Sequence, residues 1–224
     1  MSIKVGPKIV TSGLICDLDP GQIRSYTGTG NTWYNLISAN YHQQMSSVGY
    51  TTDNKGLINF NTGGYSYASI NSAINIEGPL SMTFWLKYSQ TINIQSIGIT
   101  NGTTSPTAAM QIGLRPGAIS TVWKYGGAAL LNFTNPTTNT WYHYGLTLSS
   151  SFLAVYINSI LNNSGTVSTQ SGAALSLIFG DYRTDGTGNE RIYGYVGNFQ
   201  LYNRALTAQE ILQNYNATKG RYGL

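Results

Sequence analysis

Short segments in which apolar and polar residues alternate recur along this chain, with turn-forming residues between them. In Met82–Tyr88 the apolar side chains at every second position point to one side of an extended backbone, while Thr83, Trp85 and Lys87 point to the other. Trp141–Leu148 alternates in the same way. A period of two over many short segments, separated by Gly, Asn, Ser and Thr, is typical of a β-sandwich or barrel.

Strand signals of this kind continue to the end of the chain. Besides the two segments above, they predict strands at 57–60, 65–70, 92–99, 110–114, 119–125, 130–133, 152–157, 175–179 and 193–202. Ile160 and Leu161 resume the apolar pattern after Asn158-Ser159, as a hairpin would, and the strain of serine at a positive φ leaves its turn type open. No Pro-rich linker divides the chain, so we expect one domain with two antiparallel sheets of about six strands each.

One helix is predicted near the end of the sequence. Thr207 and Glu210 have the spacing of a capping box, in which the threonine hydroxyl accepts from the Glu210 amide and the carboxylate reaches back. Leu206 and Ile211 take the N′ and N4 positions of a hydrophobic staple. An apolar stripe then continues to Tyr215, which predicts that the helix lies on the sandwich and covers part of its edge.

The composition excludes several classes of function. The 17 Tyr and 4 Trp argue against disorder, because large rings need to be buried. The twelve cations outnumber the eight anions but are scattered, so we expect no nucleic-acid partner. No apolar run reaches the roughly 18 residues of a membrane span. Met1–Val10 lacks the apolar core of a secretory signal, so we expect neither membrane insertion nor export.

The acidic residues do not form the pair that glycoside hydrolysis requires. Such enzymes hold two carboxylates roughly 5–10 Å apart, commonly at alternate positions of one strand. Asp17 and Asp19 share a strand face, but no glutamate accompanies them, and Asp19 begins a turn at Pro20-Gly21. Glu210 is occupied by helix capping. We therefore predict no catalytic residues and no enzyme activity; the remaining acids are Asp53, Glu77, Asp181, Asp185 and Glu190.

The side chains most often used as nucleophiles or zinc ligands are few and dispersed. Cys16, the single cysteine, lies in an apolar run and is expected to be buried and inert. His42 and His143 are too isolated for a zinc or catalytic set. Because His143 lies opposite the apolar face of its strand, its imidazole is expected at the surface or half-buried.

The densest charged stretch, 181–191, partly matches a calcium loop. Asp181 and Asp185 stand at its positions one and five, and a glycine follows at position six. However, Arg183 fills position three and Ile192 falls where a bidentate glutamate is required. A hairpin loop is the favoured interpretation, so calcium is not indicated and we expect no metal and no cofactor.

Aromatic rings and amides are the groups with which proteins bind sugars, and this chain is rich in both. Trp33 and Tyr65 fall in or near loops, and with Asp181, Tyr182 and Asp185 they form our set of candidate ligand-binding residues. The other aromatic residues in or near loops are Tyr26, Tyr34, Tyr41 and Tyr67. For any one ring, packing in the core or at a protein interface is the favoured alternative.

Tyr193–Thr207 combines an alternating strand with the turn Tyr-Asn-Arg-Ala-Leu-Thr, and Trp141–Tyr144 with Val155–Asn158 has the pattern of a hairpin. These segments resemble the concanavalin A-like jelly rolls, and within them the laminin-G-like and pentraxin-like branch. The family hairpin usually turns on Asn-Gly, whereas Ser159 follows Asn158 here. Four further segments resemble the version common in bacteriophage structural proteins: Leu14–Asp19, Ser25-Tyr26, Trp33–Leu36 and Asn216–Leu224.

The resemblance implies an all-β, concanavalin A-like jelly-roll sandwich with one short C-terminal helix at residues 13–217, an N-terminal arm at 1–12 and a C-terminal tail at 218–224. It also implies a non-enzymatic bacteriophage virion protein, a capsid decoration or cement protein on the particle surface. Its partners would be major capsid or other virion proteins and further copies of this chain, which the two arms would contact. The alternative is a tail-fibre or spike adhesin that binds host glycans.

Overall fold

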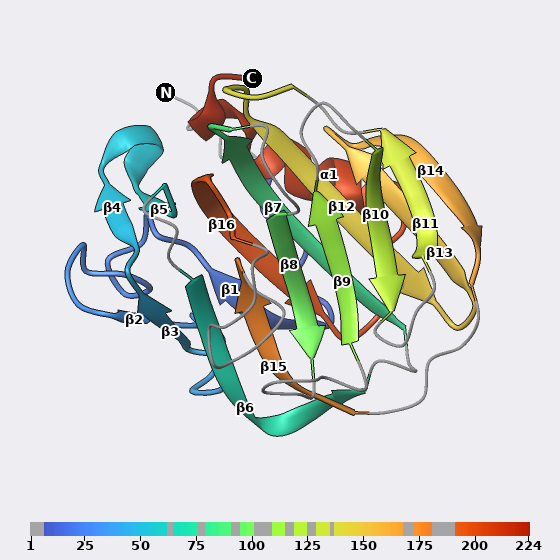
Figure 1. The fold of residues 1–224 in the computed structure, drawn as a ribbon, viewed down its shortest axis with the longest axis horizontal. Coiled ribbons are helices and arrows are strands. Elements are labelled where there is room, and N and C mark those ends of the chain that lie inside the picture. The colour runs from blue at the N-terminus through green and yellow to red at the C-terminus, as the bar shows by residue number, and fades with distance from the viewer. Residues whose placement is uncertain are drawn as a thin grey trace, which may run out of the picture.

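The computed structural model describes residues 7–61, 65–75, 79–90, 95–100, 109–114, 119–124, 129–134, 137–167, 173–180 and 191–224. In this part of the chain two antiparallel sheets face each other, and one α-helix lies behind the sheet that contains β7 (Leu80–Tyr88) and β12 (Tyr142–Ser149) (Figure 1). This is the β-sandwich with a C-terminal helix that the sequence predicts.

Sheet A is centred on two strands that are far apart in the sequence. β7 (Leu80–Tyr88) and β16 (Gly194–Tyr202) pair with each other, and an irregularity between Val196 and Phe199 interrupts their register. In spatial order the strands are β14 (Ile160–Thr166), β13 (Phe152–Ile157), β12 (Tyr142–Ser149), β7, β16, β5 (Leu57–Asn59) and β4 (Gly49–Thr51), and β1 (Leu14–Leu18) also pairs with β16.

Sheet B packs against sheet A and is drawn in front of it in Figure 1. Its strands follow the order β11 (Ala129–Thr134), β10 (Ile119–Lys124), β9 (Ala109–Leu114), β8 (Gln95–Thr100), β15 (Ala173–Phe179), β6 (Tyr65–Asn75), β3 (Gln43–Ser46) and β2 (Thr32–Trp33). In the described residues each sheet therefore has eight strands, rather than the expected six or so. The strands β2, β3 and β4 are only two to four residues long and largely polar, so hydrophobic alternation did not reveal them.

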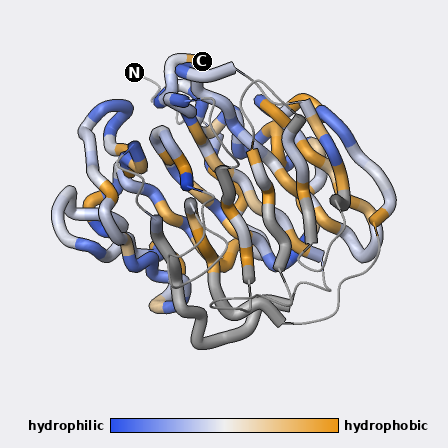
Figure 2. Tube along the Cα trace, viewed as in Figure 1, coloured by the Kyte–Doolittle hydropathy of each residue, from blue (hydrophilic) through white to orange (hydrophobic). Residues whose placement is uncertain are grey.

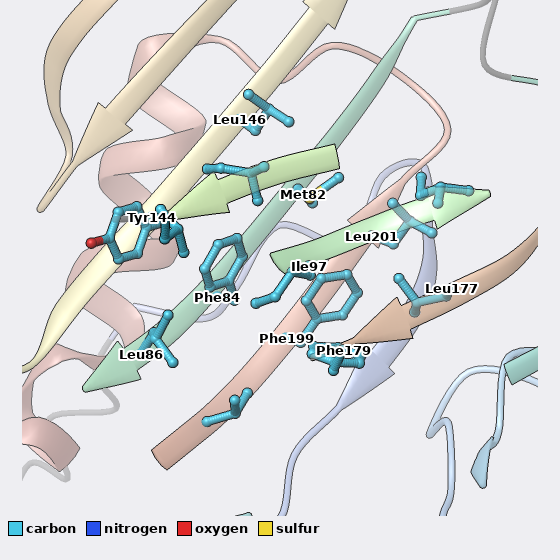
Figure 3. Packing of buried hydrophobic residues seen from close by; sticks show 14 of the residues in the cluster. Met82, Phe84, Leu86, Ile97, Tyr144, Leu146, Leu177, Phe179, Phe199 and Leu201 are labelled. Atoms are coloured by element: carbon cyan, nitrogen blue, oxygen red, sulfur yellow. The ribbon is translucent and has the colours of Figure 1, made fainter. Parts of the chain in front are cut away.

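The inward side chains of the two sheets form one core (Figure 3). Phe199 of β16 lies between Phe84 of β7 and Phe179 of β15, and its ring centroid is 5.0 Å from that of Phe179 across the sandwich. Hydrophobic segments recur along the strands in Figure 2, as the alternation predicts. Cys16 is buried in this core as expected, and burial raises the pKa of its thiol.

The helix α1 (Ala208–Thr218) begins where the sequence predicts, and it is capped as predicted. The Thr207 hydroxyl accepts from the Glu210 amide at 3.2 Å, and the Glu210 carboxylate accepts from the Thr207 amide at 2.9 Å. Arg204 donates to both oxygens of Glu210, which lowers the pKa of that carboxyl to about 2. Leu206 and Ile211 are buried in one cluster, which confirms the staple. Among the described residues, no helix has the length and apolar character needed to cross a membrane.

The hairpin between β13 and β14 turns on Asn158 and Ser159. Both residues have positive φ, 51° and 67°, which is the signature of a type I′ turn. The Asn158 side chain accepts from the backbone amide of His143 at 2.9 Å, which ties the turn to β12. Serine therefore occupies a position where glycine is usual, and this resolves the turn type that the sequence left open.

Candidate functional site

The outer face of sheet A is covered by the C-terminal part of the chain. α1 and the 3₁₀ helix η2 (Lys219–Tyr222) follow one another across it. The Tyr222 ring stacks on Trp85 with 4.2 Å between centroids, and Trp141 lies 4.7 Å from the same ring. Tyr215 of α1 stacks on the Trp85 ring at 5.8 Å. These four rings, which we call the aromatic cluster, anchor the two helices to β7 and to the start of β12.

His143 lies beneath the aromatic cluster, so the expectation of a surface or half-buried imidazole was wrong. Its side chain is 1% exposed, and its ring is 5.2 Å from Trp85 and 5.8 Å from Tyr215. Burial lowers its pKa to about 3, so the imidazole is neutral. The alternation placed His143 on the correct face of its strand, but α1 removes that face from solvent.

The residues 218–224, expected as a tail, are bound to the domain through Arg221. Its Nε donates to the carbonyl oxygen of Asn54, and its Nη2 donates to that of Gly56, both at 2.5 Å. Its Nη1 forms an ion pair with the carboxylate of Asp19. All three nitrogens of the guanidinium are therefore used, and they fasten η2 to the loop that contains the 3₁₀ helix η1 (Asp53–Lys55).

Part of the expected N-terminal arm, residues 1–12, is also bound to the domain, although residues 1–6 lie outside the described part of the chain. The Val10 amide donates to the side chain of Asn214 in α1 at 2.8 Å, and the Val10 carbonyl accepts from the Tyr202 hydroxyl at 3.0 Å. Val10 is 6% exposed. This segment therefore packs along α1 without the neighbouring subunits that the arm was expected to need.

A polar pocket of about 620 Å³ lies on the outer face of sheet A where these segments meet. We call it the outer-face pocket, and its lining comes from β1 and the segments on either side of it, from Leu36, from η1 and β16, and from the end of α1 and η2. Its polar and charged lining residues are Lys8, Thr11, Asp17, Asp19, Gln22, Lys55, Asn198, Gln200, Asn216, Thr218 and Arg221. Such a set can donate to and accept from many hydroxyl groups.

Asp17 is held in this pocket by its backbone and by its side chain. Its amide donates to the Asn35 side chain at 2.8 Å, and its carbonyl accepts from the Leu36 amide at 2.9 Å. Its carboxylate accepts from the Gln200 side chain at 3.2 Å. Burial raises the pKa of Asp17 to about 6, and the charge of Asp19 adds to the effect, whereas the bond from Gln200 opposes it.

A chain of buried hydrogen bonds fixes the group that orients Asp17. The Gln200 carbonyl oxygen accepts from the Thr83 hydroxyl at 2.8 Å, so its amide nitrogen faces Asp17. The Thr83 hydroxyl oxygen in turn accepts from the side-chain amide of Asn214 at 3.5 Å, and the same amide nitrogen donates to the Tyr202 hydroxyl at 2.9 Å. The carboxylate is therefore positioned through side chains of β16, β7 and α1 before any ligand arrives.

Asn198 contributes a second positioned amide. The irregularity in β16 falls at this residue, and such bulges redirect side chains. The Tyr222 hydroxyl donates to the Asn198 side-chain oxygen at 2.9 Å and accepts from its backbone amide at 3.0 Å. The amide nitrogen of Asn198 is thus the end that can donate toward a ligand in the pocket.

The acids of the described chain differ in how their carboxylates are engaged. Asp19 is held by Arg221 and by the amide of Gly21, and Glu210 is held by Arg204 and the helix cap. Asp17 alone has a raised pKa and no cationic partner among the described residues. Within the same residues, no three His, Cys, Asp or Glu side chains gather as a metal site would require.

Two of the candidate ligand-binding residues from the sequence can be placed. Trp33 is fully buried and packs 5.7 Å from Phe179 in the core. Tyr65 is half-buried, and the Arg191 guanidinium lies 4.7 Å from its ring. Neither residue lines the outer-face pocket. The other three candidates, Asp181, Tyr182 and Asp185, lie outside the described residues.

None of the remaining aromatic residues near loops whose side chains are described lines the pocket. Tyr26 and Tyr41 are buried, whereas Tyr34 is 43% exposed and has its ring 5.0 Å from His42. The side chain of Tyr67 lies outside the description. The pocket residues were missed because their partners are remote: Gln200 is 183 residues from Asp17, and Arg221 is 202 residues from Asp19.

A second, smaller group of exposed amides joins the edges of the two sheets. Asn162 of β14 exchanges hydrogen bonds with the backbone of Thr134 in β11, and Asn163 donates to the carbonyl of Asn132 at 2.6 Å. The adjoining groove measures only about 190 Å³. Its amides are used to bridge the sheets, so they serve as a matched comparison for those of the outer-face pocket.

Sequence comparison assigns most of the chain to one family. Residues 61–212 match the Laminin_G_3 profile, described as the concanavalin A-like lectin/glucanases superfamily. No curated protein sequence matches significantly. The matched region contains the central strands of both sheets and the beginning of α1, whereas Asp17 and Arg221 lie outside it.

Solved structures with the same fold are found at low sequence identity. Trypanosoma rangeli sialidase in complex with sialic acid has a TM-score of 0.72 and 15% identity, over 97% of this chain and 36% of that chain. Domain 4 of AbnA, an extracellular arabinanase from Geobacillus stearothermophilus, in complex with arabinotriose has a TM-score of 0.67 and 15% identity, over 91% and 98%. The binding domain of botulinum neurotoxin DC in complex with SialylT has a TM-score of 0.69 and 16% identity, over 92% and 52%. The chain thus spans about a third of the sialidase.

Proposed function

Because this chain belongs to the concanavalin A-like lectin/glucanase superfamily, we propose that it is a carbohydrate-binding domain that holds a glycan in the outer-face pocket without cleaving it. One observation carries the proposal: a pocket of about 620 Å³ contains a carboxylate, Asp17, that Gln200 and Thr83 orient from behind. Sugar hydroxyls are donors as well as acceptors, so an oriented carboxylate next to amides is suited to them.

The state of the acids supports binding rather than hydrolysis. A glycosidase needs one carboxyl group to donate a proton and a second, free carboxylate to act as base or nucleophile. Asp17 has the raised pKa of an acid, but the neighbouring Asp19 is engaged by Arg221 and Gly21. A second free carboxylate is therefore missing from the described lining of the pocket.

The fold neighbours support the same class of ligand. The three structures named above were solved with sialic acid, arabinotriose and SialylT, and one of them is a single domain that this chain covers almost completely. Their identities of 15–16% carry the fold to this chain but not their ligands. They make a sugar the first ligand class to test.

The sequence resemblance to bacteriophage structural proteins extends the proposal to a virion surface, where a glycan-binding domain would act as a tail-fibre or spike adhesin. The capsid decoration function rests on that resemblance alone and stays a prediction. Deletion of residues 1–12 is not a clean test of that function, because it would remove the Val10 contacts to α1 as well as any contact with a particle. The polar side chains that line the pocket, by contrast, favour the adhesin function.

Glycan binding by matched variants tests the proposal. We expect the wild-type chain to bind a subset of a glycan array, and we expect Asp17→Asn to weaken that binding about tenfold or more, because hydrogen bonds to a charged group contribute about 1.5–3 kcal/mol. Asn216→Ala, in the same lining, should weaken it less. The exposed Asp53→Asn and the sheet-bridging Asn163→Ala should bind as the wild type does. Absence of binding to any glycan would reject carbohydrate binding, and binding that neither Asp17→Asn nor Asn216→Ala weakens would reject the outer-face pocket as its site.

A further inference from the structure

The cations of the outer-face pocket are not arranged to clamp a carboxylate. Arg221 is the residue type best suited to bidentate recognition of an anion. Each of its three nitrogens already donates within the domain, to Asn54, Gly56 and Asp19, so three of its five N–H groups are engaged and its charge is paired with that of Asp19. The other two lining cations, Lys8 and Lys55, are exposed, and at the surface such charges are screened by solvent.

The carboxylate of Asp17, unlike the guanidinium of Arg221, has no charged partner among the described residues of the pocket. Asp17 is half-buried, and in the described chain its carboxylate has one hydrogen-bond partner, a neutral amide. It forms no ion pair with any described cation. An ionised carboxylate that has lost water and has no cationic partner gains from any donor that a ligand brings, and it repels a ligand that carries a negative charge.

From these two observations, and resting on the proposed function, we infer that the outer-face pocket selects neutral glycans, with Asp17 as the specificity-determining residue that accepts hydrogen bonds from sugar hydroxyls, and that it discriminates against sialylated and other carboxylated glycans. Two of the fold neighbours were solved in complex with sialic acid and SialylT, so the inference separates this pocket from those complexes. It follows from the charges in this pocket rather than from the fold.

The inference also predicts a dependence on pH. The pKa of Asp17 is raised to about 6, so the carboxylate that accepts from a sugar is mostly ionised at pH 7.5 and mostly protonated at pH 5. Affinity for a neutral glycan should therefore fall about tenfold between these values. The other titratable or charged groups on the elements around Asp17 are Cys16, Asp19, Lys8, Lys55, Arg221, Tyr202 and, behind Asn35, His42.

The same ionisation provides a check that Asp17→Asn is folded. Because the folded state raises this pKa above its ordinary value of 3.8, the folded state holds the proton more tightly than the unfolded state does. Stability from this group is therefore highest at pH below 3.8 and decreases as the pH rises to about 6. At pH 7 the asparagine variant should melt no lower than the wild type, although it binds less well. If the Asp17 carboxylate lowers stability at pH 7 and binding still requires it, its role is in binding and not in folding.

Isothermal titration with paired oligosaccharides tests the inference. The probes are lactose and sialyllactose, which differ by one carboxylated sugar, together with the neutral arabinotriose and whichever glycans bind on the array. The proteins are wild type, Asp17→Asn, His42→Gln and the double variant Lys8→Gln/Lys55→Gln, each at pH 7.5 and pH 5. We expect neutral glycans to bind more tightly than their carboxylated partners and to lose about tenfold in affinity at pH 5. Asp17→Asn should remove that pH dependence, whereas His42→Gln and the double lysine variant should keep it.

Three results would contradict the inference in different ways. The preference for neutral glycans would be overturned if the wild type bound sialyllactose more tightly than lactose. It would also be overturned if sialylated glycans bound more tightly to the wild type at pH 7.5 than to the wild type at pH 5 or to Asp17→Asn. Carbohydrate binding itself would remain supported in both cases. Binding of neutral glycans that is unaffected by pH and by Asp17→Asn would remove Asp17 as the specificity determinant. Failure of every glycan to bind would instead reject the proposed function on which the inference rests.

Discussion

Replacement of Tyr222 by alanine is expected to lower the free energy of unfolding by about 3–5 kcal/mol, the usual range for truncating a buried aromatic side chain. The Tyr222 ring is 5% exposed, stacks on Trp85 and contacts Trp141. Its hydroxyl makes two hydrogen bonds with Asn198, and burial raises its pKa far above the physiological range, so the hydroxyl stays protonated. Loss of the ring would leave a cavity between η2 and sheet A.

Equilibrium unfolding in urea, followed by tryptophan fluorescence, measures this effect. Tyr222→Phe is the matched variant, because it keeps the stacked ring and removes only the hydroxyl bonds, and we expect a loss of about 1–2 kcal/mol. Leu224→Ala, at an exposed position two residues away, should change stability by less than about 0.5 kcal/mol. If Tyr222→Ala had the same free energy of unfolding as Leu224→Ala, residues 218–224 would not be anchored to the domain through this ring.

The second large effect is expected at Gly194, where β16 meets β7. A Cβ atom at this position would lie 2.1 Å from the carbonyl oxygen of Lys87, and both atoms belong to paired backbones in the middle of sheet A. Neither strand can move without breaking the pair between Gly194 and Tyr88. We expect Gly194→Ala to cost about 3 kcal/mol or more, or to prevent folding.

Two other glycines in the C-terminal part provide a graded comparison for Gly194→Ala. A Cβ atom at Gly197 would lie 2.1 Å from the Tyr222 hydroxyl and would displace it from its hydrogen bonds with Asn198. Because the displaced group is a side chain and not a paired strand, we expect a smaller loss than at Gly194, about 1–3 kcal/mol. At Gly220 a Cβ atom would meet nothing within 4 Å, and we expect Gly220→Ala to be neutral within about 0.5 kcal/mol. Thermal melting of the three variants should therefore rank Gly220, Gly197 and Gly194 in order of increasing damage. A Gly194→Ala protein as stable as Gly220→Ala would contradict the central pairing of β7 with β16.

The fold could largely be predicted from the sequence because its strongest signals are local. The strand at 193–202 and the capping box at Thr207 depend on residues that are neighbours in the chain, and both are confirmed. The covering of sheet A could not be predicted in this way. Alternation shows that Trp85 and His143 point away from the core, but only the path of α1 and η2 decides that they are buried.

The candidate site could be predicted much less well, for the same reason. Aromatic character pointed to Trp33, but a large ring on a two-residue strand is needed by the core and is buried there. Asp17 and Asp19 were recognised as sharing a strand face, and they were considered only as hydrolytic acids. Their different roles depend on Gln200 and Arg221, which reach them from the other end of the chain, and no local pattern contains that information.

The location of a bound glycan tests the central claim most directly. A titration of the ¹⁵N-labelled protein with a glycan that binds on the array would follow every backbone amide by NMR. We predict that the largest shifts fall on β1 around Asp17, on Asn198 and Gln200 of β16, and on the end of α1 at Asn216. Shifts confined to sheet B, or to the Asn132–Asn163 groove, would show that the ligand is bound elsewhere and would contradict the outer-face pocket as the site.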